Sequence, residues 1–258
     1  MKKIWLIARG VLLEAVRRKE IYALVLTSLL IIACVVLLDF FQLHGISKFY
    51  REIALKVMSA ATAVATVVLA ARQLPREFEN RTIYPLLAKP VSRWRFLAGK
   101  LFGVLLAAAF CLALFLVVFV AGSLYLHAPV PWKLMLQFVY LQLLMMLILA
   151  SLAFWLSLLF NLDAAITVGI IFYITSAVIT SATAFIYEWA SGFGKALLLA
   201  LNYVLPQLTL FDLSAKTVHS DTWPPLSFQT MAELTVYAGV FITVYTALAM
   251  LSFWRRPL

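Results

Sequence analysis

The polar passage from residue 72 to residue 96 interrupts a very apolar sequence and holds most of the side chains that could do chemistry. It carries two carboxylates, Glu77 and Glu79, among several basic residues and prolines. The chain has no GxxxxGK[ST] phosphate-binding loop, because Gly99-Lys100 is followed by Leu101. Its apolar runs contain no Ser–His pair, paired carboxylates or HExxH sequence. The passage therefore suits contact with a partner better than catalysis.

The prolines and hydroxyl residues of this passage predict a short helix. Thr82 can cap its start, and Pro85 is tolerated because it falls in the first turn. Pro90 disfavours a helical conformation for the residue before it, and Ser92 can cap the helix that follows. The short helix has about two turns and presents these apolar side chains: Ile83, Tyr84, Leu86 and Leu87. A small, stiff surface of this kind suits insertion into a groove of another protein.

Composition places the chain in a membrane. Apolar residues make up 65% of the 258 residues, charged residues make up 12%, and the mean hydropathy is +1.01. Soluble domains are nearer half apolar and a quarter charged. Cys34 and Cys111 lie inside apolar runs, and the three histidines show no metal-ligand spacing. We therefore expect a single all-α transmembrane domain over residues 1–258, with no metal or cofactor of its own.

Six apolar runs are long enough to cross the hydrocarbon core, which takes about 20 residues. They cover residues 21–41, 53–71, 97–126, 134–160, 164–187 and 232–253. The sequence thus predicts six transmembrane helices, with a cytoplasmic loop at 72–96 between the second and third. An even number of spans places both termini on the same side of the membrane.

Basic residues gather on one predicted side. Of the 21 Lys and Arg residues, six precede residue 20, seven lie between residues 72 and 100, and two are at the C-terminus. Lys and Arg residues stay on the cytoplasmic side of a membrane, so both termini are predicted to be cytoplasmic. The protein is expected in the inner membrane. The net charge of +10 then reflects topology, and nucleic acid is not an expected partner. Residues 1–19 alternate apolar and basic blocks, which predicts an amphipathic interfacial helix.

The segment 188–230 is predicted to face outward. Its apolar stretch 196–205 is about half a bilayer long, which favours a re-entrant or interfacial helix. Tyr203, Pro206 and Phe211 are candidates for an outer gate. A second interpretation stays open, in which the segment only braces the bundle.

Spaced residues of the polar passage resemble the loop between the second and third spans of ABC-2 type transporter permeases. The matching residues are Glu77, Glu79, Thr82, Leu86, Leu87, Pro90, Val91, Ser92, Arg93, Phe96 and Lys100. The rest of the layout is similar to that family as well, from the N-terminal interfacial helix to the outer segment before the last span. Arg81 departs from the pattern, since the family often has Gly before the Thr.

The resemblance implies a permease subunit of an ABC transporter with the type V, ABCG-like fold. In that family a coupling helix between spans two and three docks into a separate ATP-binding subunit, which holds the ATP and Mg and is the enzyme of the complex. Carried over by position, the coupling site comprises Glu77, Glu79, Arg81, Thr82, Ile83, Tyr84, Leu86, Leu87, Pro90, Ser92 and Arg93. Two permease copies, or one copy and a homologue, would sit on two ATP-binding subunits, and export is the direction that the family implies.

Simpler interpretations of these residues stay open. Glu77 and Glu79 could only neutralise neighbouring arginines, since exposed pairs contribute about 0–1 kcal/mol. Arg93 and Arg95 could be anchors of topology. Residues 48–56, with four charged side chains, are expected to form a solvated outer face. The Ser and Thr residues of the run 164–187 could line a polar cavity or pack helices together.

Two other function classes are also open. An ion-coupled transporter or intramembrane enzyme needs ionisable groups at mid-membrane, where a charge costs about 2.5–3.5 kcal/mol. The third to fifth runs contain no Asp, Glu, Lys, Arg or His in their interiors, which weighs against this class. A membrane scaffold that passes ATP-driven force to an extracytoplasmic partner fits the same sequence features as a permease.

Overall fold

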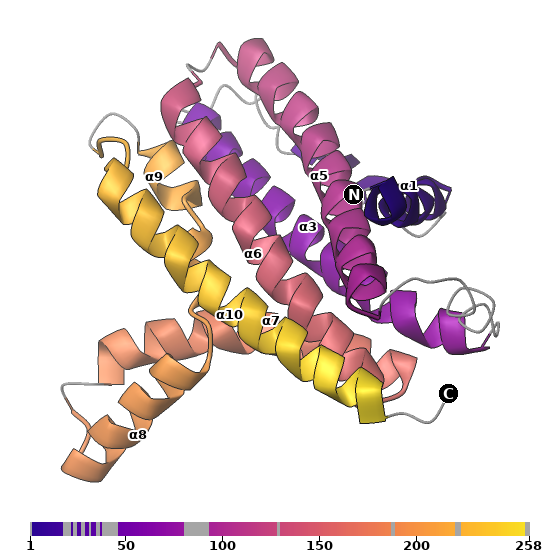
Figure 1. Ribbon diagram of the computed structural model, residues 1–258. Coiled ribbons are helices and arrows are strands. Elements are labelled where there is room, and N and C mark those ends of the chain that lie inside the picture. The colour runs from indigo at the N-terminus through magenta and orange to yellow at the C-terminus, as the bar shows by residue number, and fades with distance from the viewer. Residues whose placement is uncertain are drawn as a thin grey trace.

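The computed structural model describes residues 2–17, 46–79, 93–127, 130–186, 189–219 and 223–255, together with isolated positions between residues 22 and 37. Throughout these ranges the regular structure is helical (Figure 1). The fold class is therefore all-α, as the composition predicts.

Five helices in the described ranges are long and apolar enough to cross a membrane. They are α3 (Ile46–Glu79), α5 (Arg93–Tyr125), α6 (Trp132–Leu159), α7 (Leu162–Ile186) and α10 (Phe228–Arg255). The predicted first span, residues 21–41, lies almost wholly outside the described residues. A multi-pass membrane protein is thus confirmed, whereas the sixth span stays a prediction.

Helix α6 forms the centre of the bundle. It packs against α3, α5, α7 and α10, and 78% of its most apolar window is buried, against 17% for α7. A helix that is apolar on all sides is stable only where neighbours or lipid surround it. Figure 1 shows α7 leaving the bundle at an angle and carrying α8 (Gly192–Val204) away from the other helices.

Helix α1 (Lys2–Val16) packs closely on α5. Its buried face consists of Ala8, Val11 and Ala15, and Gly99 and Gly103 of α5 lie beneath it. A Cβ atom on Gly103 would lie 2.6 Å from the Cβ of Val11. Small residues four apart let two helices approach in this way. The predicted interfacial helix is therefore held by the bundle through one face.

The helices add one detail to the sequence-based prediction and correct another. They extend into the predicted connection 72–96 from both sides, because α3 continues through Pro75 to Glu79 and α5 already begins at Arg93. Arg51, expected on a solvated face, is only 3% exposed because it lies on the side of α3 that carries the buried Tyr50 and Ala54.

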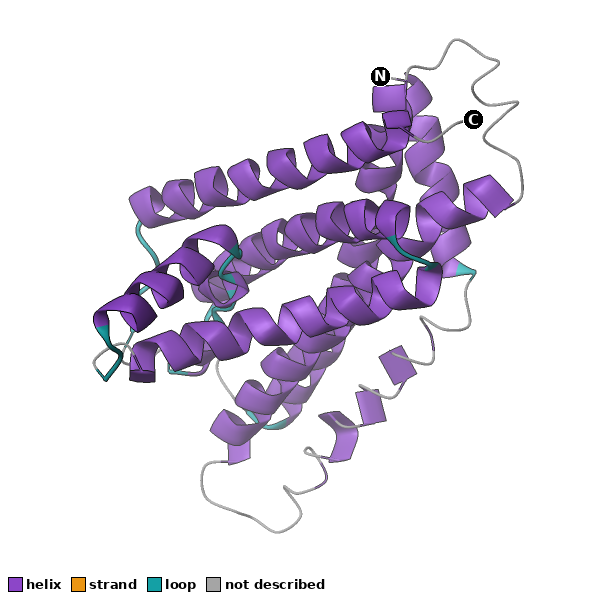
Figure 2. Ribbon diagram, turned by 90° about the horizontal axis from the view of Figure 1, so that it is seen from below, coloured by secondary structure: helices purple, strands orange, loops and turns teal. Residues whose placement is uncertain are grey.

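Helix directions alternate, so the ends of distant segments meet. One end of the bundle holds the start of α1, the end of α3, the start of α5 and the end of α10. Figure 2 shows the two ends of the chain, marked N and C, on the same side of the bundle. The end of α5 and the start of α3 meet at the opposite end, where the Tyr50 hydroxyl donates to the Phe119 carbonyl at 3.2 Å.

Candidate functional site

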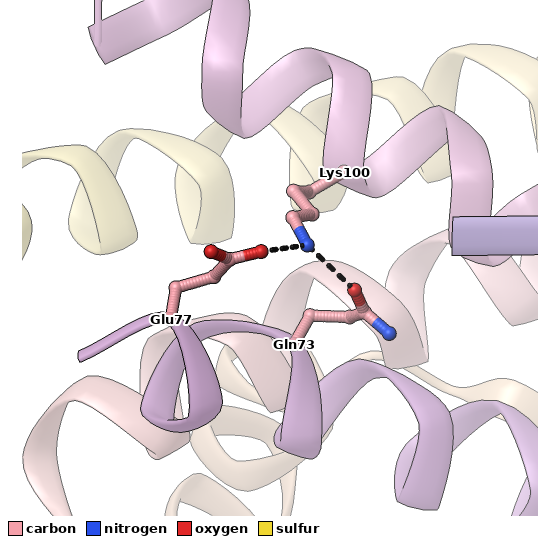
Figure 3. Close-up of polar contacts among 3 residues, drawn as sticks. All are labelled: Gln73, Glu77 and Lys100. Carbon is pink, nitrogen blue, oxygen red and sulfur yellow. Dashed lines mark hydrogen bonds and ion pairs between the residues drawn. The ribbon is translucent and has the colours of Figure 1, made fainter. Parts of the chain in front are cut away.

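A buried ion pair joins the last turns of α3 to the first turns of α5. The Lys100 ammonium group donates to the Glu77 carboxylate at 2.6 Å and to the Gln73 side-chain carbonyl at 3.1 Å (Figure 3). The Lys100 side chain is 8% exposed and that of Glu77 is 20% exposed. Glu77 and Gln73 lie four residues apart, so both face α5 from the same side of α3.

The pairing of Lys100 follows from its burial. A buried ammonium group is costly unless it is paired and hydrogen-bonded. Its two acceptors come from α3, and the Phe96 ring, whose centroid lies 5.8 Å from the ammonium nitrogen, offers its face as well. The charge on α5 is therefore stable only while the end of α3 stays in place.

Arg93 ties the same end of α5 to α10. Its guanidinium group donates to the Phe253 carbonyl at 3.4 Å and lies over the Phe253 ring, 5.5 Å from the centroid. Phe253 falls in the last turn of α10, where carbonyl groups lack helical partners and a cation is favourable. Phe96 stacks on the same ring with a centroid distance of 6.4 Å.

The start of α5 thus contacts three other helices within its first three turns. Arg93 and Phe96 face α10, Lys100 faces α3, and Gly99 and Gly103 face α1. We call the segment Arg93–Gly103 the α5 hub. It directly follows residues 80–92 in the sequence, and its side chains pack against all three helices.

Cations at the start of α5 are not explained by helix stability. Arg93 and Arg95 lie in the first turn, which has no acidic residue, and the helix dipole disfavours positive charge there. Arg93 is compensated by its contact with the end of α10. Arg95 is exposed. Exposure is expected both for a residue that anchors the topology and for one that contacts a partner.

The predicted coupling residues fall into two groups. Glu77 and Arg93 are described and flank the connection, and Glu79 is the last residue of α3 with a side chain outside the described part. The others lie outside the described residues: Arg81, Thr82, Ile83, Tyr84, Leu86, Leu87, Pro90 and Ser92. Sequence reasoning placed Lys100 in the motif without a role and missed Gln73 and Phe253, because only the fold brings these residues together.

The outer candidates lie where the chain returns from α8 to the bundle. The Ser176 hydroxyl of α7 donates to the Pro206 carbonyl at 2.7 Å and accepts from the Leu208 amide at 3.0 Å. The Gln207 amide donates to the Tyr237 hydroxyl of α10 at 3.0 Å.

Two of the three outer candidates are buried at this return. Pro206 and Phe211, which lies in the 3-10 helix η2 (Leu208–Phe211), are both buried. The side chain of Tyr203 lies outside the described part. A role for these residues as a gate stays a prediction.

Hydroxyl groups of α7 are used in packing and within the helix. Ser176 holds the return segment, whereas Thr180 and Thr183 donate to carbonyls of their own helix at 2.9 Å and 2.8 Å. In the described ranges no three His, Cys, Asp or Glu side chains lie together as metal ligands would.

These features define a multi-pass helical membrane protein with a buried ion pair between the end of α3 and the start of α5. A family model described as ABC-2 family transporter protein matches residues 14–258. The chain belongs to this family of membrane subunits. No curated protein matches the chain in sequence.

Proposed function

We propose that the protein is the permease subunit of an ABC transporter and that the connection 80–92 couples it to a separate ATP-binding subunit. Membership of the ABC-2 family supports the class. One observation carries the coupling role: both ends of the connection are tied into the bundle, by Glu77–Lys100 on one side and by Arg93–Phe253 on the other.

The proposed mechanism follows from these ties. ATP-driven approach of two ATP-binding subunits displaces the connection, and the α5 hub passes the displacement to α1, α3 and α10. The bundle then changes between inward and outward openings, because nucleotide binds the two states with different affinity. The chain itself contributes no step of ATP hydrolysis, and ATP with Mg belongs to the partner.

The proposed orientation has the α5 hub on the cytoplasmic side. That end of the bundle carries basic residues from α1, the end of α3, the start of α5 and the end of α10. Lys and Arg residues of membrane proteins are retained on the cytoplasmic side. Two permease copies, or one copy and a homologue, complete the pathway, and export is the proposed direction.

Co-purification tests the docking step. The tagged protein, purified from its native membranes, is expected to retain an ATP-binding cassette subunit that hydrolyses ATP. Replacing Leu86 and Leu87 together by Asp places two charges on the proposed apolar contact and is expected to release that subunit. Leu210→Asp, at an exposed leucine of η2, is the matched control and leaves the subunit bound.

The outcome is interpretable only if both variants fold. Equal yield and the same elution volume on gel filtration establish this. A subunit retained at full strength by the Leu86→Asp, Leu87→Asp protein contradicts docking at this connection.

A further inference from the structure

A groove lies between the first turns of α6 and α10, at the end of the bundle opposite the α5 hub. It is an open groove of about 660 Å³, a volume within the range of small-molecule sites. The α6 side contributes Gln137 and Tyr140, and the α10 side includes Phe228, Ala232 and Val236. No coupling residue contributes to it.

The lining of the groove is apolar, and its polar groups are bonded across it. The Tyr140 and Thr235 hydroxyls lie 2.9 Å apart. The Gln137 side-chain amide both donates to and accepts from the backbone of Leu226, each at 2.9 Å. These bonds hold the two walls together, so an occupant is not needed to satisfy them. Apolar lining favours an apolar occupant.

The length of the groove matches one leaflet of a bilayer. Its α10 wall runs from Phe228, the first residue of the helix, to Val236, which at 1.5 Å per residue is about 12 Å. Half of the hydrocarbon core is about 15 Å. Because the groove begins at the starts of both helices, it extends from the membrane boundary toward mid-membrane.

The charge at the open end fits a phosphate. Lys133 lies one turn before Gln137, on the same face of α6 and closer to the membrane boundary, and its side chain is exposed. Trp132 beside it is 58% exposed, as residues of the interfacial aromatic belt are. A cation at the headgroup level above an apolar groove is complementary to an anionic phosphate above an acyl chain.

We propose that this groove is a phospholipid site, in which one acyl chain lies between α6 and α10 and the phosphate contacts Lys133. The site requires that the chain lies in a membrane and is independent of the coupling to an ATPase. It is distinct from the general lipid contact of α7 and α10, because it has two walls, a defined length and a cation one turn of α6 before its lining residue Gln137.

Photo-crosslinking in reconstituted vesicles tests the site. The purified protein is placed in phosphatidylcholine vesicles with a small fraction of phosphatidylglycerol that carries a diazirine in its acyl chain, and adducts are mapped by mass spectrometry. We expect adducts to concentrate on Met231 and Val236, with several-fold fewer on Ile171 and Val244, which are also exposed to lipid. Adducts spread evenly over these positions would show general lipid contact only and would overturn the proposal.

Three changes separate the parts of the site. Ala232→Phe fills the groove and is expected to lower labelling of Met231 several-fold, while Ala247→Phe, at an exposed alanine of the same helix, leaves it unchanged. Lys133→Gln, and a diazirine diacylglycerol that lacks the phosphate, are each expected to lower labelling as well. Labelling that is unchanged by Ala232→Phe refutes the acyl-chain site, and equal labelling by the diacylglycerol refutes the phosphate contact.

Discussion

The ammonium nitrogen of Lys100 on α5 lies 2.6 Å from a carboxylate oxygen of Glu77 on α3, across the two ends of the connection 80–92. Both residues belong to the motif that resembles ABC-2 permeases, yet they are 23 positions apart in sequence. The Glu77 carboxylate compensates the buried ammonium charge of Lys100, which would otherwise be costly. It also holds α3 and α5 at a fixed spacing where the connection leaves the bundle.

Lys100→Met is expected to destabilise the bundle. It removes the ammonium group and leaves the Glu77 carboxylate mostly buried, a change that costs about 3–5 kcal/mol in buried pairs. Because both groups retain some exposure, we expect the lower end of that range. Thermal unfolding in detergent measures the loss as a lower Tm.

The double variant Glu77→Gln, Lys100→Met is the matching control. It removes both charges of the pair, so its Tm is expected to lie above that of Lys100→Met alone. If the second change brings no recovery, the ion pair contributes nothing to the stability of this end of the bundle.

Gly103→Leu is expected to displace α1 from α5. A Cβ at Gly103 would already lie 2.6 Å from Val11 and 3.0 Å from Ala8. Overpacking of this kind costs about 1–3 kcal/mol. Faster tryptic cleavage at Arg17, measured in detergent, would report the displaced helix.

Gly239→Leu on α10 is the matched control, because a Cβ there meets no atom within 4 Å. It is expected to leave the cleavage rate at Arg17 unchanged. A Gly103→Leu protein that is cleaved at the wild-type rate would contradict the close packing of α1 on α5.

Ser176→Ala is expected to loosen the return segment. It leaves the Pro206 carbonyl and the Leu208 amide without their buried partner, and each such loss costs about 1–3 kcal/mol. Hydrogen exchange of a peptide covering residues 205–213 is expected to rise.

Thr183→Ala removes a hydroxyl that donates to the Ile179 carbonyl of its own helix and should leave that exchange unaltered. Equal exchange in both variants and in the wild type would mean that Ser176 does not hold the segment.

The sequence predicts the helices well and their contacts poorly. The runs that became α5, α6 and α10 are long and uninterrupted, so their length alone identifies them. The second span was predicted to end at residue 71, whereas α3 continues through Pro75 to Glu79, and Gln73 and Glu77 in this extension contact Lys100.

Packing partners could not be predicted for a physical reason. Helix α6 is apolar on every side, so no hydrophobic face shows which neighbours it meets. Arg51 looks like a solvated charge in sequence, and only the packing of α3 buries it. The contact of Arg93 with Phe253 joins residues 160 positions apart, beyond the reach of any local pattern.

The central claim, that the α5 hub and the connection 80–92 face the cytoplasm, is tested most directly by thiol labelling. In a protein with Cys34→Ser and Cys111→Ala, a single cysteine is introduced as Leu86→Cys, and as Trp223→Cys for the opposite end. The outer layer of the cell envelope is first permeabilised, and a membrane-impermeant maleimide is then added. The Trp223→Cys protein is expected to be labelled at once. The Leu86→Cys protein is expected to be labelled only after the inner membrane is permeabilised as well. Labelling at 86 in intact cells would invert the orientation and contradict docking of a cytoplasmic ATP-binding subunit.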